Sequence, residues 1–259
     1  MSNVAEKADQ AAGRPVRAAR PGRRPSSIVQ GVAIGLGLVL MLGGFALIAV
    51  DYRPYRIPSA SMTPTLQIGD TVLARKADGG TVGRGDVVVF RDQAWGGELM
   101  VKRVVAVGGD TVACCGDGNR LSVNGEAVDE PYLTKDGVQG AAFSVQVPAG
   151  RLFMLGDNRM NSLDSRTHVE VAGGSVPATD VVARVEATIQ PFGRLGMLGR
   201  PGSFDAVGGP GASAPGPLEP AAYATVVGAG LIVLTCAVSG VAGWAGRVGR
   251  RRSKAGTAA

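Results

Sequence analysis

The chain has 259 residues, 45% of them hydrophobic, and its composition excludes a disordered or fibrous protein. Its formal net charge of +6 would be compatible with nucleic-acid binding. The basic residues, however, gather in two tails: six of the 27 lie in the first 26 positions and five lie after position 246. Each group adjoins a long apolar stretch, so the pattern indicates membrane topology and no nucleic-acid partner.

The first apolar stretch covers residues 27–50, carries no charge and ends at Asp51. It is long enough to cross the hydrocarbon layer as a helix, so we predict a transmembrane helix preceded by a basic cytoplasmic tail, residues 1–26. A cleavable signal peptide is the alternative. It is disfavoured because the run exceeds the ~7 to 15 apolar residues usual in a signal peptide, and a small-x-small triplet lies inside the run.

A second apolar, glycine-rich stretch covers residues 221–246 and is followed by a basic tail, residues 247–259. We predict a second transmembrane helix; its length and basic flank disfavour a buried core helix. Positive residues flank the amino end of the first span and the carboxyl end of the second. Both termini are therefore predicted to be cytoplasmic in a multi-pass protein of the cell membrane, with residues 51–198 as an extracytoplasmic domain.

The segment between the spans has mostly strand-type periodicity. The hairpin expected at residues 121–128 has Asn124-Gly125 at its turn, a pair that suits a two-residue connection. Residues 199–220 turn to Gly, Pro, Ala and Ser, which suits a flexible linker. The predicted fold class is mainly β, a membrane-tethered antiparallel sheet or partly closed barrel with two transmembrane helices. Further strands, rich in β-branched residues, are predicted at 71–74, 87–90, 98–107, 142–147, 151–155 and 181–190.

The adjacent Cys114 and Cys115 lie in the predicted outer domain, where oxidation is permitted. A vicinal disulfide, two free thiols and bonds to a partner all stay open. The cysteines lack metal-ligand spacing, so we predict no metal site and no cofactor.

Ser61 lies in the proline-bounded run Ile57 to Leu66, just after the first span, and is the candidate nucleophile. A serine hydroxyl needs a base before it can attack. The chain's only histidine, His168, would give a Ser-His-Asp hydrolase with Asp157 and Asp164, but its surroundings have no glycine-rich or strained character.

Lys102 is the better candidate base, because it lies within the apolar strand predicted at residues 98–107. Desolvation lowers the pKa of a lysine, and a neutral amine can take the proton of a serine. The alternative is that strand alternation places Lys102 in solvent. A polar segment at residues 156–166, GDNRMNSLDSR, follows another predicted strand and offers side chains that could support such a pair.

Four segments in this order, PSASMTPTL, GDVVVF, VKRVVAVGGD and GDNRMNSLDSR, closely resemble the bacterial type I signal peptidase family. The resemblance covers most of residues 55–186, and two spans with the second at the carboxyl end are similar to the actinobacterial form. It implies a Ser-Lys dyad, with Ser61 as nucleophile and Lys102 as general base. It also implies an oxyanion hole formed by the Ser59 hydroxyl and the Ser61 N–H.

The same resemblance implies supporting residues around the dyad. Ser162 would hydrogen-bond and orient the lysine amine. Arg103 would pair with Asp157 and Asp164, and Arg166 would complete the cluster. Met160 stands where the family commonly has an acidic residue, so a charge contact at that position is absent. The predicted walls of shallow substrate pockets are Ile57, Pro58, Met62, Leu66, Met100 and Val101.

The implied function is that of a membrane-bound serine endopeptidase that removes amino-terminal signal peptides from exported preproteins after small-x-small sites. Its predicted partners are secretory preproteins, the lipid bilayer and the protein export machinery. Three alternatives stay open: a self-cleaving or regulatory Ser-Lys protease, a pilin-type signal peptidase of narrow specificity, and a non-enzymatic membrane scaffold. The presence of both Ser61 and Lys102 argues against the last.

Overall fold

A computed structural model describes residues 25–115, 120–134, 142–208 and 213–256 of the chain. The chain divides into two compact units, one made of residues 1–38 and 229–259 and the other of residues 39–228.

Two helices contain stretches that are long and apolar enough to cross a membrane: Ser27–Asp51 and Leu218–Ala242. The helices themselves are α1 (Pro25–Asp51) and α2 (Leu218–Gly256). Both expose large apolar side chains such as Val39 and Val233, which would be costly in water and are expected in lipid. α2 begins three residues before the predicted span, because Leu218 is buried against Tyr52 and Ala187 and belongs to the domain.

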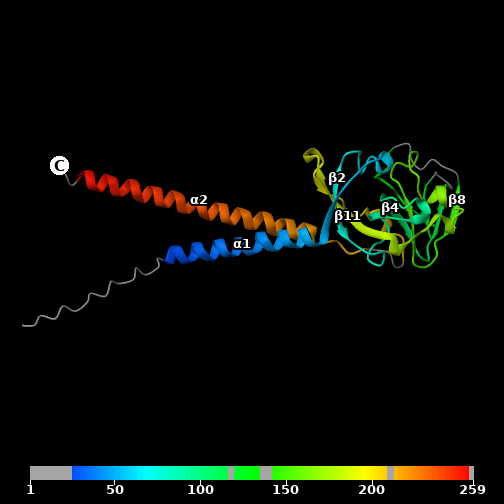
Figure 1. Cartoon of the computed structure of the whole chain (residues 1–259), viewed down its shortest axis with the longest axis horizontal. Coiled ribbons are helices and arrows are strands. Elements are labelled where there is room, and N and C mark those ends of the chain that lie inside the picture. The colour runs from blue at the N-terminus through cyan, green and yellow to red at the C-terminus, as the bar shows by residue number, and fades with distance from the viewer. Residues whose placement is uncertain (1–24, 116–119, 135–141, 209–212, 257–259) are drawn as a thin grey trace, which may run out of the picture. The chain divides into compact units, whose positions relative to one another are not determined.

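The larger sheet has eight strands, in the order β1-β2-β11-β3-β4-β9-β10 with β12 beside β11. Figure 1 labels β2, β4 and β11 of this sheet. Every pairing in it is antiparallel. β1 and β10 lie at the two ends of the strand order and do not pair with each other, so the sheet does not close into a barrel. The strands are β1 (Tyr52–Arg56), β2 (Thr71–Lys76), β3 (Val87–Phe90), β4 (Met100–Val107), β9 (Arg151–Leu155), β10 (Val176–Pro177), β11 (Val181–Gln190) and β12 (Gly196–Met197).

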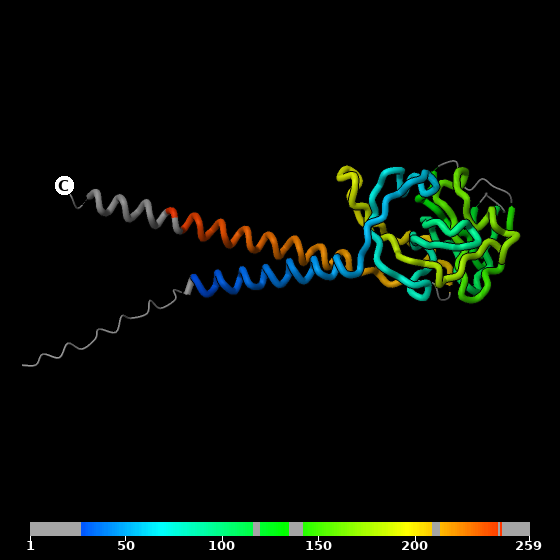
Figure 2. The backbone as a smooth tube through the Cα atoms, in the orientation of Figure 1, coloured from blue at the N-terminus to red at the C-terminus, as the bar shows by residue number. Residues whose placement is uncertain are grey.

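A second sheet of four antiparallel strands has the order β7-β6-β5-β8. Asn124 and Gly125 have φ values of 55° and 84°, which confirms the predicted two-residue hairpin turn. Figure 2 shows the described backbone between β1 and β12 gathered into one rounded domain. The strands of the second sheet are β5 (Thr111–Cys114), β6 (Ser122–Val123), β7 (Glu126–Ala127) and β8 (Phe143–Gln146).

The predicted mainly β fold class with two apolar helices is confirmed, although some short strands were not predicted. β1 was missed because its sequence, YRPYR, has two arginines, a proline and no β-branched residue. Proline is tolerated there because β1 is an edge strand paired only with β2. β5, β10 and β12 were also not predicted. Cys114 and Cys115 form a disulfide with each other, which decides a question that the sequence left open.

Several described residues of the segment before α2 pack against the domain. Phe204 and Val207 are buried, 1% and 4% exposed, and pack in one core cluster with Val105 and Phe153. Ser213 donates a hydrogen bond to Asp86 at 2.8 Å. Its few large apolar side chains therefore hold the described part of this connection against the domain.

Candidate active site

Ser61 lies in a 3-10 turn, η1 (Ala60–Met62), that follows the edge strand β1. The side chain of Met62 anchors the turn in the core with Ile57. Asn158 fixes the other side, because its N–H donates to the Ser61 carbonyl at 2.9 Å and its side chain donates to the Ala60 carbonyl at 3.1 Å. The turn that carries Ser61 is thus held between the core and the segment 156–166.

Lys102 lies on β4, where it pairs in register with Val88 of β3. Its Nζ is 3.0 Å from Ser61 Oγ, within hydrogen-bonding distance, although the two residues are 41 positions apart in sequence. Nζ also bonds the Val101 carbonyl at 3.3 Å. The sequence alternative that Lys102 faces solvent is wrong, since the residue is only 4% exposed.

Burial lowers the pKa of Lys102 below its usual value, while the carboxylates of Asp164 and Asp157 act in the opposite direction. Desolvation is the largest of these influences because the charged ammonium loses its hydration inside the protein. A neutral amine has a lone pair that can accept a proton from the serine hydroxyl. The pair therefore has the geometry and the protonation tendency that a nucleophile and its base require.

The hydroxyl of Ser59 lies beside the nucleophile, with its Oγ 3.3 Å from Ser61 Oγ. Unlike Lys102, Ser59 is exposed. An exposed hydroxyl at this point could turn toward a substrate oxygen. The role of Ser59 in an oxyanion hole stays a prediction.

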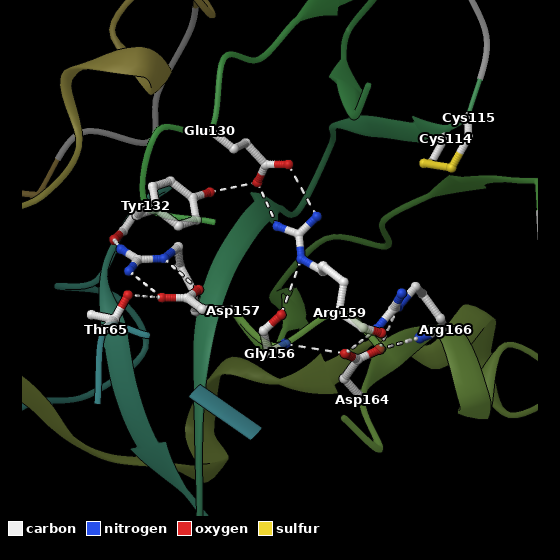
Figure 3. Close-up of polar contacts among 12 residues, drawn as sticks. Thr65, Cys114, Cys115, Glu130, Tyr132, Gly156, Asp157, Arg159, Asp164 and Arg166 are labelled. Atoms are coloured by element: carbon white, nitrogen blue, oxygen red, sulfur yellow. Dashed lines mark hydrogen bonds and ion pairs between the residues drawn. A yellow bond between two sulfur atoms is a disulfide. The ribbon is translucent and has the colours of Figure 1, made fainter. Parts of the chain in front are cut away.

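The structure brings Arg103 and Asp157 together in a fork of two hydrogen bonds. Arg103 Nε and Nη2 donate to the two Asp157 oxygens at 2.9 and 2.6 Å, and Nη1 donates to the Gly85 carbonyl at 2.8 Å. Thr65 adds a hydroxyl bond to Asp157 at 2.5 Å (Figure 3). Arg103 is 1% exposed, so this ion pair is fully desolvated and its bidentate geometry matters.

Asp164 pairs with Arg166. The predicted pairing of Asp164 with Arg103 is not found, because Arg103 pairs with Asp157. Arg166 Nε and Nη2 donate to its two oxygens, each at 2.9 Å (Figure 3). The Gly156 N–H also donates to Asp164, at 3.0 Å. Each of the two carboxylates that act on Lys102 therefore has its own arginine.

Ser162 Oγ is buried and finds no hydrogen-bond partner among the residues that the structure describes. It lies against Gly156, where a Cβ would come within 2.2 Å of Ser162 Oγ and 2.5 Å of the Ser61 carbonyl oxygen. The predicted bond from Ser162 to the Lys102 amine stays a prediction. Met160, where the family commonly has an acidic residue, is 67% exposed.

The side chain of His168 is engaged elsewhere. Its ring stacks on Trp95 with centroids 4.3 Å apart, and its Nδ1 lies 3.0 Å from both the Asp164 carbonyl and Thr167 Oγ1. Ser61 instead has Lys102 within hydrogen-bonding distance. The geometry thus favours a lysine base over the Ser-His-Asp alternative.

A groove of about 360 Å³ runs beside the dyad. Five of the six predicted pocket residues line it: Ile57, Pro58, Met62, Met100 and Val101. Leu66 does not; it is 0% exposed and packs in the core with Ile57 and Met62. The remaining lining residues are Tyr55, Arg56, Ser59, Ser61, Val89, Leu99 and Lys102.

Several residues near the site had no signal in the sequence. Glu130 binds Arg159, and Tyr132 covers the Arg103 guanidinium at 4.1 Å from its ring centroid. Thr65 belongs to the same run as Ser61, but its contact with Asp157 joins positions 92 apart. Among the described residues, no group of three or more His, Cys, Asp or Glu side chains could hold a metal ion.

Residues 28–190 match the family described as signal peptidase, peptidase S26. The chain belongs to this family. It is 36% identical over 162 residues to signal peptidase I U of Bacillus subtilis, a match that covers 58% of this chain and 82% of the relative. It is 31% identical over 232 residues to signal peptidase I of Mycobacterium tuberculosis, covering 69% of this chain and 78% of the relative. A crystal structure of a signal peptidase I from Enterococcus faecalis is 28% identical, with a TM-score of 0.33, and covers 39% of this chain and 93% of its own.

The range matched by the signal peptidase family includes the residues of the candidate active site. Ser61, Lys102 and the segment 156–166 all fall between residues 28 and 190, as does most of α1. The second apolar helix, α2, lies beyond the matched range.

Proposed function

We propose that this membrane-associated serine endopeptidase is a type I signal peptidase that cuts exported preproteins after small-x-small sites with a Ser61-Lys102 dyad. The observation that carries the proposal is the 3.0 Å approach of Lys102 Nζ to Ser61 Oγ at a buried position. The relatives named above, which are signal peptidases, support the same conclusion.

The reaction begins with neutral Lys102, whose Nζ takes the proton of Ser61 Oγ as that oxygen attacks the carbonyl carbon of the scissile bond. The oxyanion that forms accepts hydrogen bonds from the Ser61 N–H and the Ser59 hydroxyl. When the tetrahedral intermediate collapses, the C–N bond breaks and the Lys102 ammonium gives its proton to the leaving amine. The signal peptide is then held as an ester on Ser61 Oγ.

The second half repeats the chemistry with water. Lys102, neutral again, takes a proton from a water molecule that attacks the ester carbonyl. The signal peptide leaves with a new carboxyl group, and Ser61 Oγ regains its proton. One amine thus serves as base twice and as acid twice, which requires a pKa low enough for the neutral form to be populated near neutral pH.

The groove beside the dyad fits a substrate with small side chains. Its apolar walls include Ile57, Met100 and Val101, which would contact small apolar side chains of the substrate. The edge strand β1 leads into the turn that carries Ser61, and β4 carries Lys102, so an extended peptide would lie between them in the manner of an added strand.

In the proposed topology both apolar helices cross the membrane and both termini are cytoplasmic. The basic residues outside the two spans support this orientation. Residues 51–198 would form the extracytoplasmic peptidase domain and residues 199–220 the connection to the second span. A dyad that follows the first span so closely would stand at the membrane surface, where a preprotein emerges from the export machinery with its signal peptide still in the bilayer.

The proposal is tested by incubating full-length protein in detergent micelles with a preprotein that has an Ala-x-Ala site. Wild type should cleave it, whereas Ser61→Ala and Lys102→Ala should not. His168→Ala is the matched control and should retain cleavage, because its ring stacks on Trp95. A preprotein with phenylalanine in place of the alanine before the cut should resist cleavage, and a pilin-type substrate tests narrow specificity. Retained cleavage by either dyad variant would refute the mechanism.

A further inference from the structure

Glu130 and Tyr132 lie just after β7, outside the segments that carry the dyad, yet both contact its supporting arginines. Glu130 accepts two hydrogen bonds from Arg159, at 3.0 and 2.5 Å, and one from the Tyr132 hydroxyl at 2.5 Å (Figure 3). The side chains of Arg159 and Glu130 are only 1% and 4% exposed. This is a bidentate pair in a dry setting, a more demanding arrangement than a surface salt bridge.

Arg159 connects this pair to the loop beneath the nucleophile. Its Nε donates to the Gly156 carbonyl at 3.0 Å, and its own carbonyl accepts from Arg166 at 2.8 Å. Gly156 in turn contacts the Ser61 carbonyl so closely that a Cβ would come within 2.5 Å of it. Glu130 therefore holds Arg159, and Arg159 holds Gly156 against the Ser61 carbonyl.

Tyr132 makes a second connection. Its ring lies over the Arg103 guanidinium, 4.1 Å from centroid to carbon, while the same guanidinium forks onto Asp157. Burial, with the nearby Glu130 charge adding to it, raises the pKa of Tyr132 well above its usual value, so the phenol stays neutral and donates to Glu130. The ring both excludes water from the Arg103 guanidinium and supplies an attractive face to its charge.

We propose that Glu130 and Tyr132 are positioning residues of the catalytic centre, which hold Arg159 and Arg103 and through them keep residues 156–157 against Ser61 and Lys102. The inference rests on the peptidase function proposed above. It assigns the segment after β7 a role that neither the dyad motifs nor the pocket predicted.

The expected consequences follow from which contact is lost. Glu130→Gln removes the charge that balances Arg159, so the arginine is left buried without its counter-ion and the loop at Gly156 shifts. Displacing a reacting group by ~1 Å costs as much as ~100-fold in rate, so we expect kcat to fall about 10- to 100-fold with little change in KM. Tyr132→Phe, which loses only the hydroxyl bond, should give a smaller fall in the same direction.

Tyr132→Leu should change the pH profile as well as the rate. Without the ring, water reaches the Arg103–Asp157 pair beside Lys102, and a better hydrated amine favours its charged form. The acidic limb of the kcat/KM profile should then move to higher pH. A purely structural role would lower the unfolding temperature and leave that limb in place.

The test measures kcat, KM and the pH profile of preprotein cleavage for the full-length variants in detergent micelles, with circular dichroism melting to confirm folding. Glu126→Gln is the control, an exposed glutamate four positions from Glu130, and should match wild type. If Glu130 acts through Arg159, the double variant Glu130→Gln, Arg159→Gln should lose no more than the worse single variant.

If Glu130→Gln and Tyr132→Leu fold and have the same kcat and pH profile as wild type, the positioning role is overturned. Additive losses in the double variant would also overturn it. Should Glu130→Gln fail to fold, Tyr132→Phe decides, because it removes one hydroxyl and keeps the ring. A wild-type protein that cleaves no preprotein would refute the proposed function instead, so the two failures are distinguishable.

Discussion

Replacing Lys102 with methionine should abolish cleavage and at the same time stabilise the protein. Lys102 is 4% exposed, and its burial lowers the pKa of its amine. Methionine is an apolar side chain of similar length, so it fills the site without a charge that must be desolvated. Each unit by which folding depresses a pKa costs about 1.4 kcal/mol of stability at a pH below the folded pKa, and the cost shrinks as the pH rises toward the unfolded pKa.

The sign of the pH dependence follows from proton binding. The unfolded chain holds the lysine proton up to a pH of about 10.4, whereas the folded site releases it at a lower pH. In wild type, stability therefore rises with pH between the lowered folded pKa and the unfolded value, and is lost as pH falls through that window. Lys102→Met lacks this dependence, so its advantage over wild type should be largest at neutral or lower pH and should shrink toward pH ~10.

Urea unfolding of the full-length protein in detergent micelles, followed by tryptophan fluorescence between pH 6 and 10, measures both effects. Lys76→Met is the matched control, because Lys76 is an exposed lysine at the end of β2 and should give neither a gain nor an altered pH dependence. A Lys102→Met protein that is less stable than wild type at pH 7, with the pH dependence unchanged, would refute the idea that the base is a desolvated amine.

Three further changes test the surroundings of the dyad. Ser59→Ala should lower kcat about 100- to 1000-fold with a similar KM, as loss of one oxyanion donor does, and an unchanged kcat would remove Ser59 from the mechanism. Gly156→Ala should impair turnover because its Cβ would meet the Ser61 carbonyl oxygen, whereas Gly193→Ala, with nothing within 4 Å, should not. Arg103→Met should cost about 3 to 5 kcal/mol in urea unfolding by leaving Asp157 unpaired, and the double change Arg103→Met, Asp157→Leu should recover much of it; equal losses would contradict the pairing.

The strands that form the site could be predicted because their burial follows directly from their composition. The sequence of β4, MVKRVVAV, is almost wholly apolar apart from two basic residues, and the structure buries five consecutive positions from Lys102 to Ala106. Two adjacent charged residues in a strand buried on both faces require internal partners. The pairing of Arg103 with the segment 156–166 came from the family resemblance, and the structure places Asp157 of that segment against Arg103.

The partners from outside those segments could not be predicted, because long-range side-chain contacts leave no local pattern. Glu130 and Tyr132 belong to a short stretch after a hairpin, and no periodicity distinguishes them from surface residues. The exchange of partners by Asp164, from Arg103 to Arg166, depends on a turn in which Asp164 caps the following 3-10 helix by accepting from the Arg166 N–H. The disulfide between Cys114 and Cys115 likewise depends on backbone geometry that adjacent cysteines alone do not determine.

The site has to solve two opposed electrostatic problems within one buried volume. Desolvation favours the neutral form of Lys102, but the same desolvation would penalise the ionised carboxylates of Asp157 and Asp164. The carboxylates are each matched by a bidentate arginine, whose charge offsets their burial. Within the described part of the chain, the hydrogen-bond partners of Lys102 are Ser61 Oγ and the Val101 carbonyl, and neither is a carboxylate. Arg103 and Arg166 each bind a carboxylate, whereas the Lys102 amine binds none among the described residues, so burial can favour its neutral form, as the proposed mechanism requires.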